Sequence, residues 1–286
     1  VRIMGADVVY SPANYGPLMV GRSVVLIRNS LAVAMKEVRL SKIAYWVAVA
    51  SMTLLSLLVA RRVVAVSRYT VDSLIHWPFG AIRKKISIVN HGVSESFGPG
   101  PSSGRRGNVL LAVGDIYIQK NYHTLIEVFR RLLVRHPDLV LSIAGRPVDR
   151  DYADSLKTTI ATLGLEGKVN FLGHVAPEDL ARLYRECRVF AFPSTVETFG
   201  NPLVEALACG APVACSNRTA MPEIAGDAVE FFDPEDAGSM LAAIERLLTD
   251  EARCAELSRL AVARASHFSW ERSAAEVAAI LKQAAS

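Results

Sequence analysis

The sequence has few of the residues and patterns that mark several common protein classes. Its 286 residues include four cysteines, none of which forms a C-x-x-C pair: Cys187, Cys209, Cys215 and Cys254. Without such pairs a zinc site or a disulfide framework is not indicated, and we predict free thiols in a reducing cytosol. The net charge is only +4, and the basic residues are dispersed. The sequence therefore predicts no nucleic-acid partner.

Long uncharged runs are also scarce, and only residues 43–60 approach the length of a membrane span. This stretch contains Ser51, Thr53 and Ser56, and it leads directly into the strand-like Val63–Val66. A helix that crosses back over a sheet explains its length and its position, so we predict that helix and not a span. A peripheral membrane contact through the outer face of 43–60 stays open. We expect a cytoplasmic protein, either free or peripheral at the inner face of the membrane.

From residue 108 onward, short apolar runs alternate regularly with helical patterns. Leu125, Val128, Phe129, Leu132 and Leu133 keep the spacing of a helix with one apolar face. Strands separated by helices of this size predict a parallel, doubly wound sheet, whose ligands bind beyond the carboxyl ends of the strands. The six predicted strands are Val109–Val113, Leu139–Ala144, Val169–Leu172, Val189–Phe192, Val213–Ser216 and Val229–Phe232.

A Gly/Pro/Ser-rich linker, Phe97–Gly104, precedes this unit. Upstream of it lies a second α/β unit, which we expect to be incomplete at its beginning because four strands make a thin sheet. We predict domains at residues 1–98 and 99–268, followed by a crossing helix at 269–286. The four upstream strands are predicted at Asp7–Tyr10, Val24–Ile27, Val63–Val66 and Ile86–Val89.

The most informative stretch runs from Pro193 to Gly210. A buried strand ends at its start, a polar loop follows, and Asn201 is predicted to cap a helix with Pro202 at its first position. The loop thus brings the N–H groups of a helix N-terminus to the carboxyl edge of the sheet, which is an anion site suited to a diphosphate. Glu197 can face sugar hydroxyls, and Glu205 can accept hydrogen bonds from a ribose diol.

The spacing of Glu197 and Glu205, with Phe199-Gly200 and Glu205-Ala206 inside the pattern, resembles the signature of a large family of retaining glycosyltransferases, group 1 (family 4). Supporting segments match in order, from Asn90–Val93 to Phe268–Trp270, and Ala13–Pro17 and Ile27–Asn29 resemble acceptor-side loops. The resemblance implies the GT-B fold: two Rossmann-like, doubly wound parallel-sheet domains facing a cleft, here with an incomplete N-terminal one.

The resemblance also implies roles for individual residues. Glu197 and Lys120 are the implied catalytic residues, and Lys120 also supplies a cation for the diphosphate. Many members carry an arginine where this chain has Asp115, so Lys120 acts alone or a basic side chain such as Arg146 provides the second charge. The implied donor-binding residues are Gly114, Asp115, Lys120, Val175, Phe199, Gly200, Asn201, Pro202, Leu203 and Glu205.

The implied activity is transfer of a hexose from a nucleoside-diphosphate sugar to a hydroxyl acceptor, with retention of configuration, in cell-surface glycan or glycolipid synthesis. The partners are a GDP-mannose or UDP-hexose donor and a glycan or lipid-linked acceptor, with no cofactor and no metal. His91, His123 and His174 are interpreted as structural residues. Another enzyme class on this fold, such as an epimerase or a phosphorylase, and an inactive nucleotide-sugar-binding relative or partner subunit remain alternatives.

Overall fold

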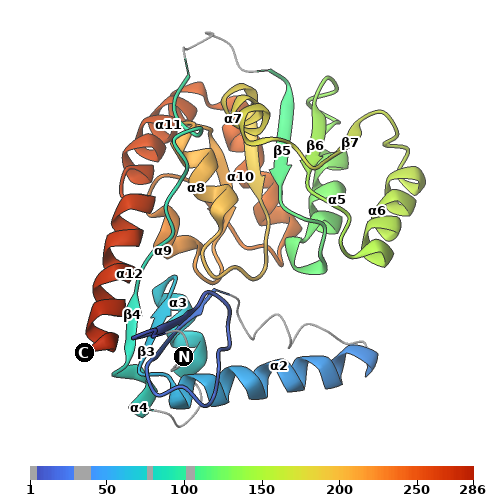
Figure 1. Cartoon of the computed structure of the whole chain (residues 1–286). Coiled ribbons are helices and arrows are strands. Elements are labelled where there is room, and N and C mark those ends of the chain that lie inside the picture. Colours follow the sequence, from blue (N-terminus) through green and yellow to red (C-terminus); the bar gives the residue numbers. More distant parts are fainter. Residues whose placement is uncertain (1–4, 29–39, 76–79, 101–106) are drawn as a thin grey trace. The chain divides into compact units, whose positions relative to one another are not determined.

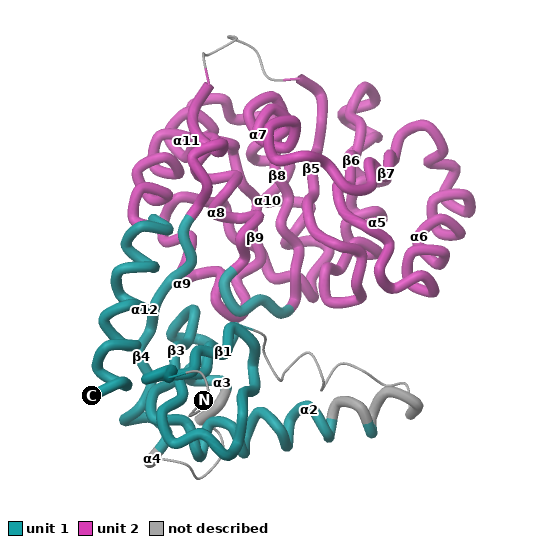
Figure 2. The backbone as a smooth tube through the Cα atoms, in the orientation of Figure 1, with its two compact units in different colours: residues 1–92, 196–199, 268–286 teal, residues 93–195, 200–267 magenta. Residues whose placement is uncertain are grey.

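The computed structural model describes residues 5–28, 40–75, 80–100 and 107–286 (Figure 1). The chain divides into two compact units, coloured separately in Figure 2. Unit 1 comprises residues 1–92, 196–199 and 268–286, and unit 2 comprises residues 93–195 and 200–267. Asn29 and residues 101–104 of the predicted linker lie outside the described residues.

Unit 1 contains a four-stranded parallel sheet in chain order, β1 (Val9–Ser11), β2 (Ser23–Ile27), β3 (Arg62–Ala65) and β4 (Ile86–Ile88). Alternate strand residues face opposite sides of this sheet. Val25 and Val63 pack with Leu57 of α2, whereas Val24 and Val64 pack with Ile280 of α12. The helices are α2 (Leu40–Val59), α3 (Arg68–Ile75), α4 (Gly80–Arg83) and α12 (Trp270–Ala285).

Unit 2 contains a six-stranded parallel sheet in the order β10-β9-β8-β5-β6-β7. Its strands are β5 (Val109–Val113), β6 (Val140–Ala144), β7 (Val169–Gly173), β8 (Val189–Phe192), β9 (Val213–Ser216) and β10 (Glu230–Phe232). The 3-10 turn η2 (Ile118–Lys120) follows β5. The helices are α5 (Tyr122–Leu132), α6 (Arg150–Thr162), α7 (Pro177–Glu186), α8 (Asn201–Ala208), α9 (Met221–Ala225), α10 (Ala237–Thr249) and α11 (Glu251–Ala265).

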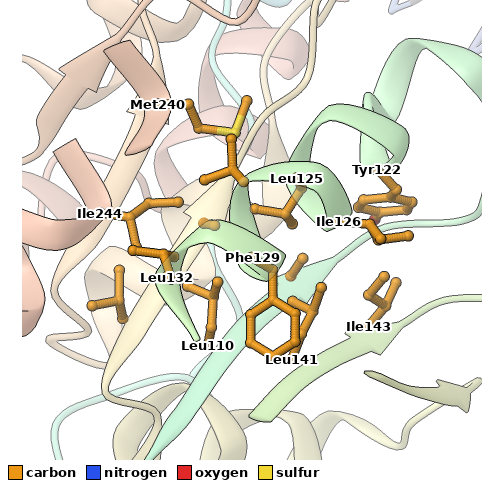
Figure 3. Close-up of a cluster of buried hydrophobic side chains, with 14 of the residues drawn as sticks. Leu110, Tyr122, Leu125, Ile126, Phe129, Leu132, Leu141, Ile143, Met240 and Ile244 are labelled. Atoms are coloured by element: carbon orange, nitrogen blue, oxygen red, sulfur yellow. The ribbon is translucent and has the colours of Figure 1, made fainter. Parts of the chain in front are cut away.

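The core of unit 2 lies between this sheet and the helices α5 and α10. Figure 3 shows Leu110 and Leu141 of the strands, Phe129 of α5 and Ile244 of α10 pointing toward one another. The apolar stripe predicted for α5 is confirmed: Leu125, Val128, Phe129 and Leu132 are at most 1% exposed, and the fifth member, Leu133, follows the helix half-buried against the same core. Burying such side chains stabilises a fold by roughly 1.5–3 kcal/mol each.

Helices cover the other face of the sheet as well, which makes the unit doubly wound. Val189 and Ala191 of β8 belong to the core under α5 and α10. The alternate residue Phe190 meets Tyr184 of α7 edge-on, with ring centroids 5.2 Å apart. Strand alternation thus supplies one apolar layer to each side.

The predicted elements agree closely with the observed ones. Each of the ten predicted strands exists within two residues of its predicted ends. The uncharged stretch forms helix α2, which leads into β3 as expected. Within the described ranges, no helix combines the length and apolar character needed to cross a bilayer. All four cysteines are free, as predicted, and the structure buries each of them.

Candidate functional site

Three glycines stand at the carboxyl edge of the unit 2 sheet, where β5, β6 and β7 end. The N–H of Gly114 donates to the carbonyl of Ala144, and the N–H of Gly145 donates to that of Gly173. A Cβ added at Gly145 would lie 2.0 Å from the Gly114 oxygen. Backbone therefore packs directly on backbone at this edge, and a side chain at Gly145 would separate the two loops.

Lys120 is held beside this glycine edge. It ends η2, and the next residue, Asn121, adopts a left-handed conformation with φ 57°. The buried Asn121 amide donates to the Pro234 carbonyl at 2.8 Å, which fixes the turn. The Lys120 ammonium lies 5.3 Å from the centroid of the Phe192 ring, and a Cβ on Gly114 would be 3.0 Å from it. Its charge thus sits where β5 and β8 end.

The N-terminus of α8 meets the same phenylalanine. Gly200 adopts φ 84°, and a Cβ there would lie 3.3 Å from Cε1 of Phe192. Lys120 and the start of α8 therefore converge on one ring. This arrangement combines a side-chain cation with the N–H groups of a helix N-terminus, which together suit an anion.

One detail of the predicted helix start is wrong. The residue that caps α8 is Gly200, not Asn201, and no side chain hydrogen-bonds to the cap. Asn201 is instead the first helical residue, with Pro202 in the first turn. The physical reason is the tight turn: at φ 84° a glycine is unstrained, and asparagine would carry a steric cost. Leu203 is buried in the helix interface, at 0% exposure.

Glu205 lies one turn into α8 and is half-buried. One of its carboxylate oxygens, Oε2, accepts a hydrogen bond of 3.1 Å from the hydroxyl of the buried Tyr184. Burial raises the pKa of Glu205 above its ordinary value, and the Tyr184 hydroxyl opposes that rise. The bond orients the carboxylate, because it engages one of its two oxygens, Oε2.

Sequence reasoning missed this role for Tyr184. The tyrosine appears in the sequence only as one more apolar member of the helix after Pro177, together with Leu180 and Leu183. Nothing in that pattern connects it to a glutamate 21 residues later. The link exists only because α7 and α8 pack side by side on one face of the sheet.

Asp115 and Arg146 form an ion pair at the same edge. Arg146 Nη2 lies 2.7 Å from Asp115 Oδ2, and both the Nε and the backbone N–H of Arg146 donate to Oδ1. This bonding lowers the pKa of Asp115. The loops that carry the pair are joined through the backbone, since the N–H of Ile116 donates to the Arg146 carbonyl at 2.8 Å. The carboxylate that replaces the expected arginine is therefore compensated by an arginine from the next loop.

Glu197 belongs to unit 1, with the short segment 196–199. The ring of Phe199 is buried between His91 and Phe268, with centroid distances of 5.0 Å and 5.5 Å. The Thr198 hydroxyl donates to the Arg28 carbonyl at 2.6 Å. These contacts give Glu197 a fixed backbone, and its side chain is half-buried.

Val175 lies half-buried in the loop after β7, next to the exposed His174. His91 and His123 both contact aromatic side chains: His91 meets Trp270 at 5.4 Å between ring centroids, and His123 bonds the Tyr152 hydroxyl at 2.9 Å. Over the described part of the chain, no group of three or more His, Cys, Asp or Glu residues is arranged to hold a metal ion.

Solved structures share this fold. The Anabaena protein Alr3699/HepE, solved in complex with UDP and glucose, is similar over 99% of this chain and 79% of its own, with a TM-score of 0.83 and 22% identity. WaaG, a glycosyltransferase involved in lipopolysaccharide biosynthesis, is similar over 99% of this chain and 78% of its own, with a TM-score of 0.75 and 16% identity. With its two parallel-sheet α/β units, the chain therefore has the predicted GT-B fold.

Residues 101–264, more than half of the chain, match the family described as Glycosyl transferases group 1. The chain belongs to this family, as its signature residues predicted. The O-antigen chain mannosyltransferase B of Escherichia coli is 36% identical over 166 residues, covering 56% of this chain and 42% of that protein. The mannosylfructose-phosphate synthase of Agrobacterium fabrum is 30% identical over 238 residues, covering 77% and 52%. The chain thus spans about half the length of these relatives or less.

Proposed function

We propose that this protein transfers a hexose from a nucleoside-diphosphate sugar to a hydroxyl acceptor, with retention of the anomeric configuration. The observation that carries the proposal is the convergence of Lys120 and the N-terminus of α8 on Phe192. A diphosphate leaving group needs positive charge and N–H donors at the point where its own negative charge develops. Membership of the family supports the same reaction.

The remaining residues have distinct tasks in this scheme. Lys120 and the first N–H groups of α8 stabilise the departing diphosphate, and Glu205 accepts the ribose hydroxyls through the oxygen that Tyr184 does not engage. Glu197 holds hydroxyls of the transferred sugar and favours the positive charge that develops on its ring. The leaving phosphate takes the proton of the acceptor hydroxyl on the same face of the sugar, which retains the configuration. No step requires a metal ion or a cofactor.

The names of the relatives support a class of donor and acceptor. Two of them carry mannosyltransferase or mannosylfructose-phosphate synthase in their names, and a protein of similar fold binds UDP and glucose. We therefore propose GDP-mannose or a UDP-hexose as the donor and a glycan or lipid-linked glycan of the cell surface as the acceptor. Such a reaction takes place in the cytoplasm, where nucleotide sugars are made.

A panel of UDP-, GDP- and ADP-sugars tests the proposal. Binding is measured by calorimetry, and release of the nucleoside diphosphate is followed with and without glycan acceptors. We expect one donor to bind, with binding weakened at least tenfold by Lys120→Ala. In Glu197→Ala, release should fall far more than binding. A matched control is Lys157→Ala, which removes a lysine that pairs with Asp154 of α6 at 2.9 Å. If no nucleotide sugar binds, the proposal is wrong.

The second candidate is an inactive relative or partner subunit that binds nucleotide sugar without turnover. The carboxylate of Asp115 favours it, because a negative charge at this edge opposes the diphosphate. The pairing with Arg146 counts against it, since the guanidinium compensates that charge. Donor binding without release, with every acceptor in the panel, would select this candidate.

A further inference from the structure

Helix α2 of unit 1 exposes several large apolar side chains, although Leu57 of the same helix is buried in the core. Thr53 and Ser56 are each 1% exposed, whereas five large apolar side chains of the same helix are well exposed. They are Val47 (59%), Met52 (39%), Leu55 (46%), Leu58 (42%) and Val59 (42%), and we refer to them as the apolar face of α2. With 3.6 residues per turn, these five positions fall within an arc of about 140° and so lie on one side of the helix.

The inward polar groups have structural partners that explain their position. The Ser56 hydroxyl accepts a hydrogen bond from the N–H of Gly16 at 3.0 Å and donates to the carbonyl of Gly16 at 3.1 Å. The Thr53 hydroxyl donates to the Val49 carbonyl of the preceding turn. Ser56 thus fastens the loop between β1 and β2 to α2. The same loop carries an exposed apolar side chain of its own, since Met19 is 100% exposed.

A rim of basic residues adjoins the C-terminal end of this helix. They occupy the positions before β2, β3 and β4 and the first position of β3: Arg22, Arg61, Arg62, Arg83, Lys84 and Lys85. Because the strands are parallel, these positions share one edge of the sheet. α2 ends at that same edge, where the Lys85 ammonium donates to the carbonyls of Leu58 and Ala60. In the five positions before each strand of the unit 1 sheet, Asp7 is the only acidic residue among those that the structure describes.

We propose that the apolar face of α2 and its basic rim form a docking surface for an anionic lipid bilayer. Leu55 and Leu58 are exposed large apolar side chains, which an apolar boundary would cover. The six basic side chains complement anionic headgroups, and the helix lies along the interface because it is not apolar enough to cross. Unit 1 thereby holds the enzyme at the surface where lipid-linked acceptors reside. The inference goes beyond the glycosyl transfer proposed above.

Vesicle sedimentation with the full chain tests this surface. Vesicles of pure phosphatidylcholine are compared with vesicles that also contain phosphatidylglycerol, at low and high salt. We expect binding to the anionic vesicles that salt weakens. Leu55→Glu/Leu58→Glu should lower that binding about tenfold or more, since both side chains leave the apolar boundary. Arg61→Glu/Lys84→Glu should lower it by a similar factor, because each basic residue contributes about a fivefold gain near an anionic surface.

The matched control is Val134→Glu, which places the same charge at an apolar residue of unit 2 that is 84% exposed. It should bind vesicles like the unaltered chain. Urea unfolding, measured on every variant, reports folding separately, and nucleotide-sugar binding separates this inference from the proposed transferase. The inference is overturned if the unaltered chain ignores anionic vesicles, or if Leu55→Glu/Leu58→Glu binds them normally. It is likewise overturned if the chain is a dimer in solution that this variant dissociates, because a second copy then covers the face.

Discussion

The hydrogen bond between Tyr184 and Glu205 leads to a quantitative prediction. Tyr184→Phe removes one hydroxyl and preserves the shape of the ring, so the edge-on contacts with Phe97 and Phe190 survive. What the variant loses is a donor to a carboxylate inside a largely apolar layer. We expect two consequences, a higher pKa of Glu205 and weaker donor binding at mildly acidic pH.

The size of the effect follows from the geometry. Hydrogen bonds to charged groups contribute about 1.5–3 kcal/mol. At 3.1 Å this bond is longer than a strong O–H···O⁻ contact, so the lower end of that range applies. A loss of about 1.5 kcal/mol corresponds to about one pKa unit. Because the bond favours the ionised form, its removal must raise the pKa of Glu205, which burial has already moved above 4.5.

The assay is the dissociation constant of the nucleotide sugar as a function of pH. A ribose diol donates to the ionised carboxylate, so binding should weaken as the pH falls through the pKa of Glu205. In Tyr184→Phe this loss should begin about one unit higher. The stability difference between variant and unaltered chain should be largest at neutral pH and shrink as the pH falls, because the bond to the ionised form is then absent from both.

Tyr152→Phe serves as the matched control, since Tyr152 is also buried and its hydroxyl bonds His123 and no carboxylate. This control should be less stable than the unaltered chain, but its donor binding should weaken at the same pH as that of the unaltered chain. The reasoning is refuted if Tyr184→Phe binds donor with the pH dependence of the unaltered chain. It is also refuted if Glu205→Gln binds donor at neutral pH as tightly as the unaltered chain.

Three further predictions concern the Asp115–Arg146 ion pair, the glycine edge beside it and the metal requirement of the reaction. Arg146→Ala should weaken nucleotide-sugar binding, because the Asp115 carboxylate then faces the diphosphate alone. Adding Asp115→Ala should restore most of the affinity, and a double variant as weak as the single one would contradict this compensation. Gly145→Ala should cost about 3 kcal/mol or more in urea unfolding, since its Cβ would meet the Gly114 oxygen at 2.0 Å. Gly167→Ala, whose Cβ meets nothing within 4 Å, should cost only about 1–2 kcal/mol for its positive φ. Finally, dialysis against EDTA should leave nucleoside-diphosphate release unchanged, and restoration of lost release by Mg²⁺ or Mn²⁺ would show that the reaction needs a metal.

Much of the fold was predictable because its signals are local. Each strand of unit 2 is a short apolar run, and α5 shows its buried face as a repeat from Leu125 to Leu132. Such patterns reflect burial on one or both faces of an element, which the order of neighbouring residues determines. The helix start at Gly200 was missed by one residue, because Asn and Gly compete for the cap and only the backbone angle decides between them.

The candidate site, too, was predictable from the sequence only in part. The positions of Glu197, Gly200 and Glu205 relative to one helix start follow from their spacing along the chain, so the sequence by itself predicted an anion site there. Only the tertiary structure placed Lys120 and the start of α8 on one phenylalanine ring. Lys120 follows β5, whereas Phe192 ends β8, and the sheet sets these two strands side by side. Pairings such as Tyr184 with Glu205 bring together residues from elements that the sheet sets side by side.

The exposed apolar face of α2 shows the same limit of prediction from sequence. The sequence determined that residues 43–60 form an uncharged helix, because composition and length suffice for that. It did not determine which side of the helix is buried, since apolar residues occur all around it and the period of 3.6 gives little contrast. In the structure Leu57 packs into the core of unit 1, the Ser56 hydroxyl bonds the backbone of Gly16 40 residues away, and Leu55 and Leu58 stay exposed.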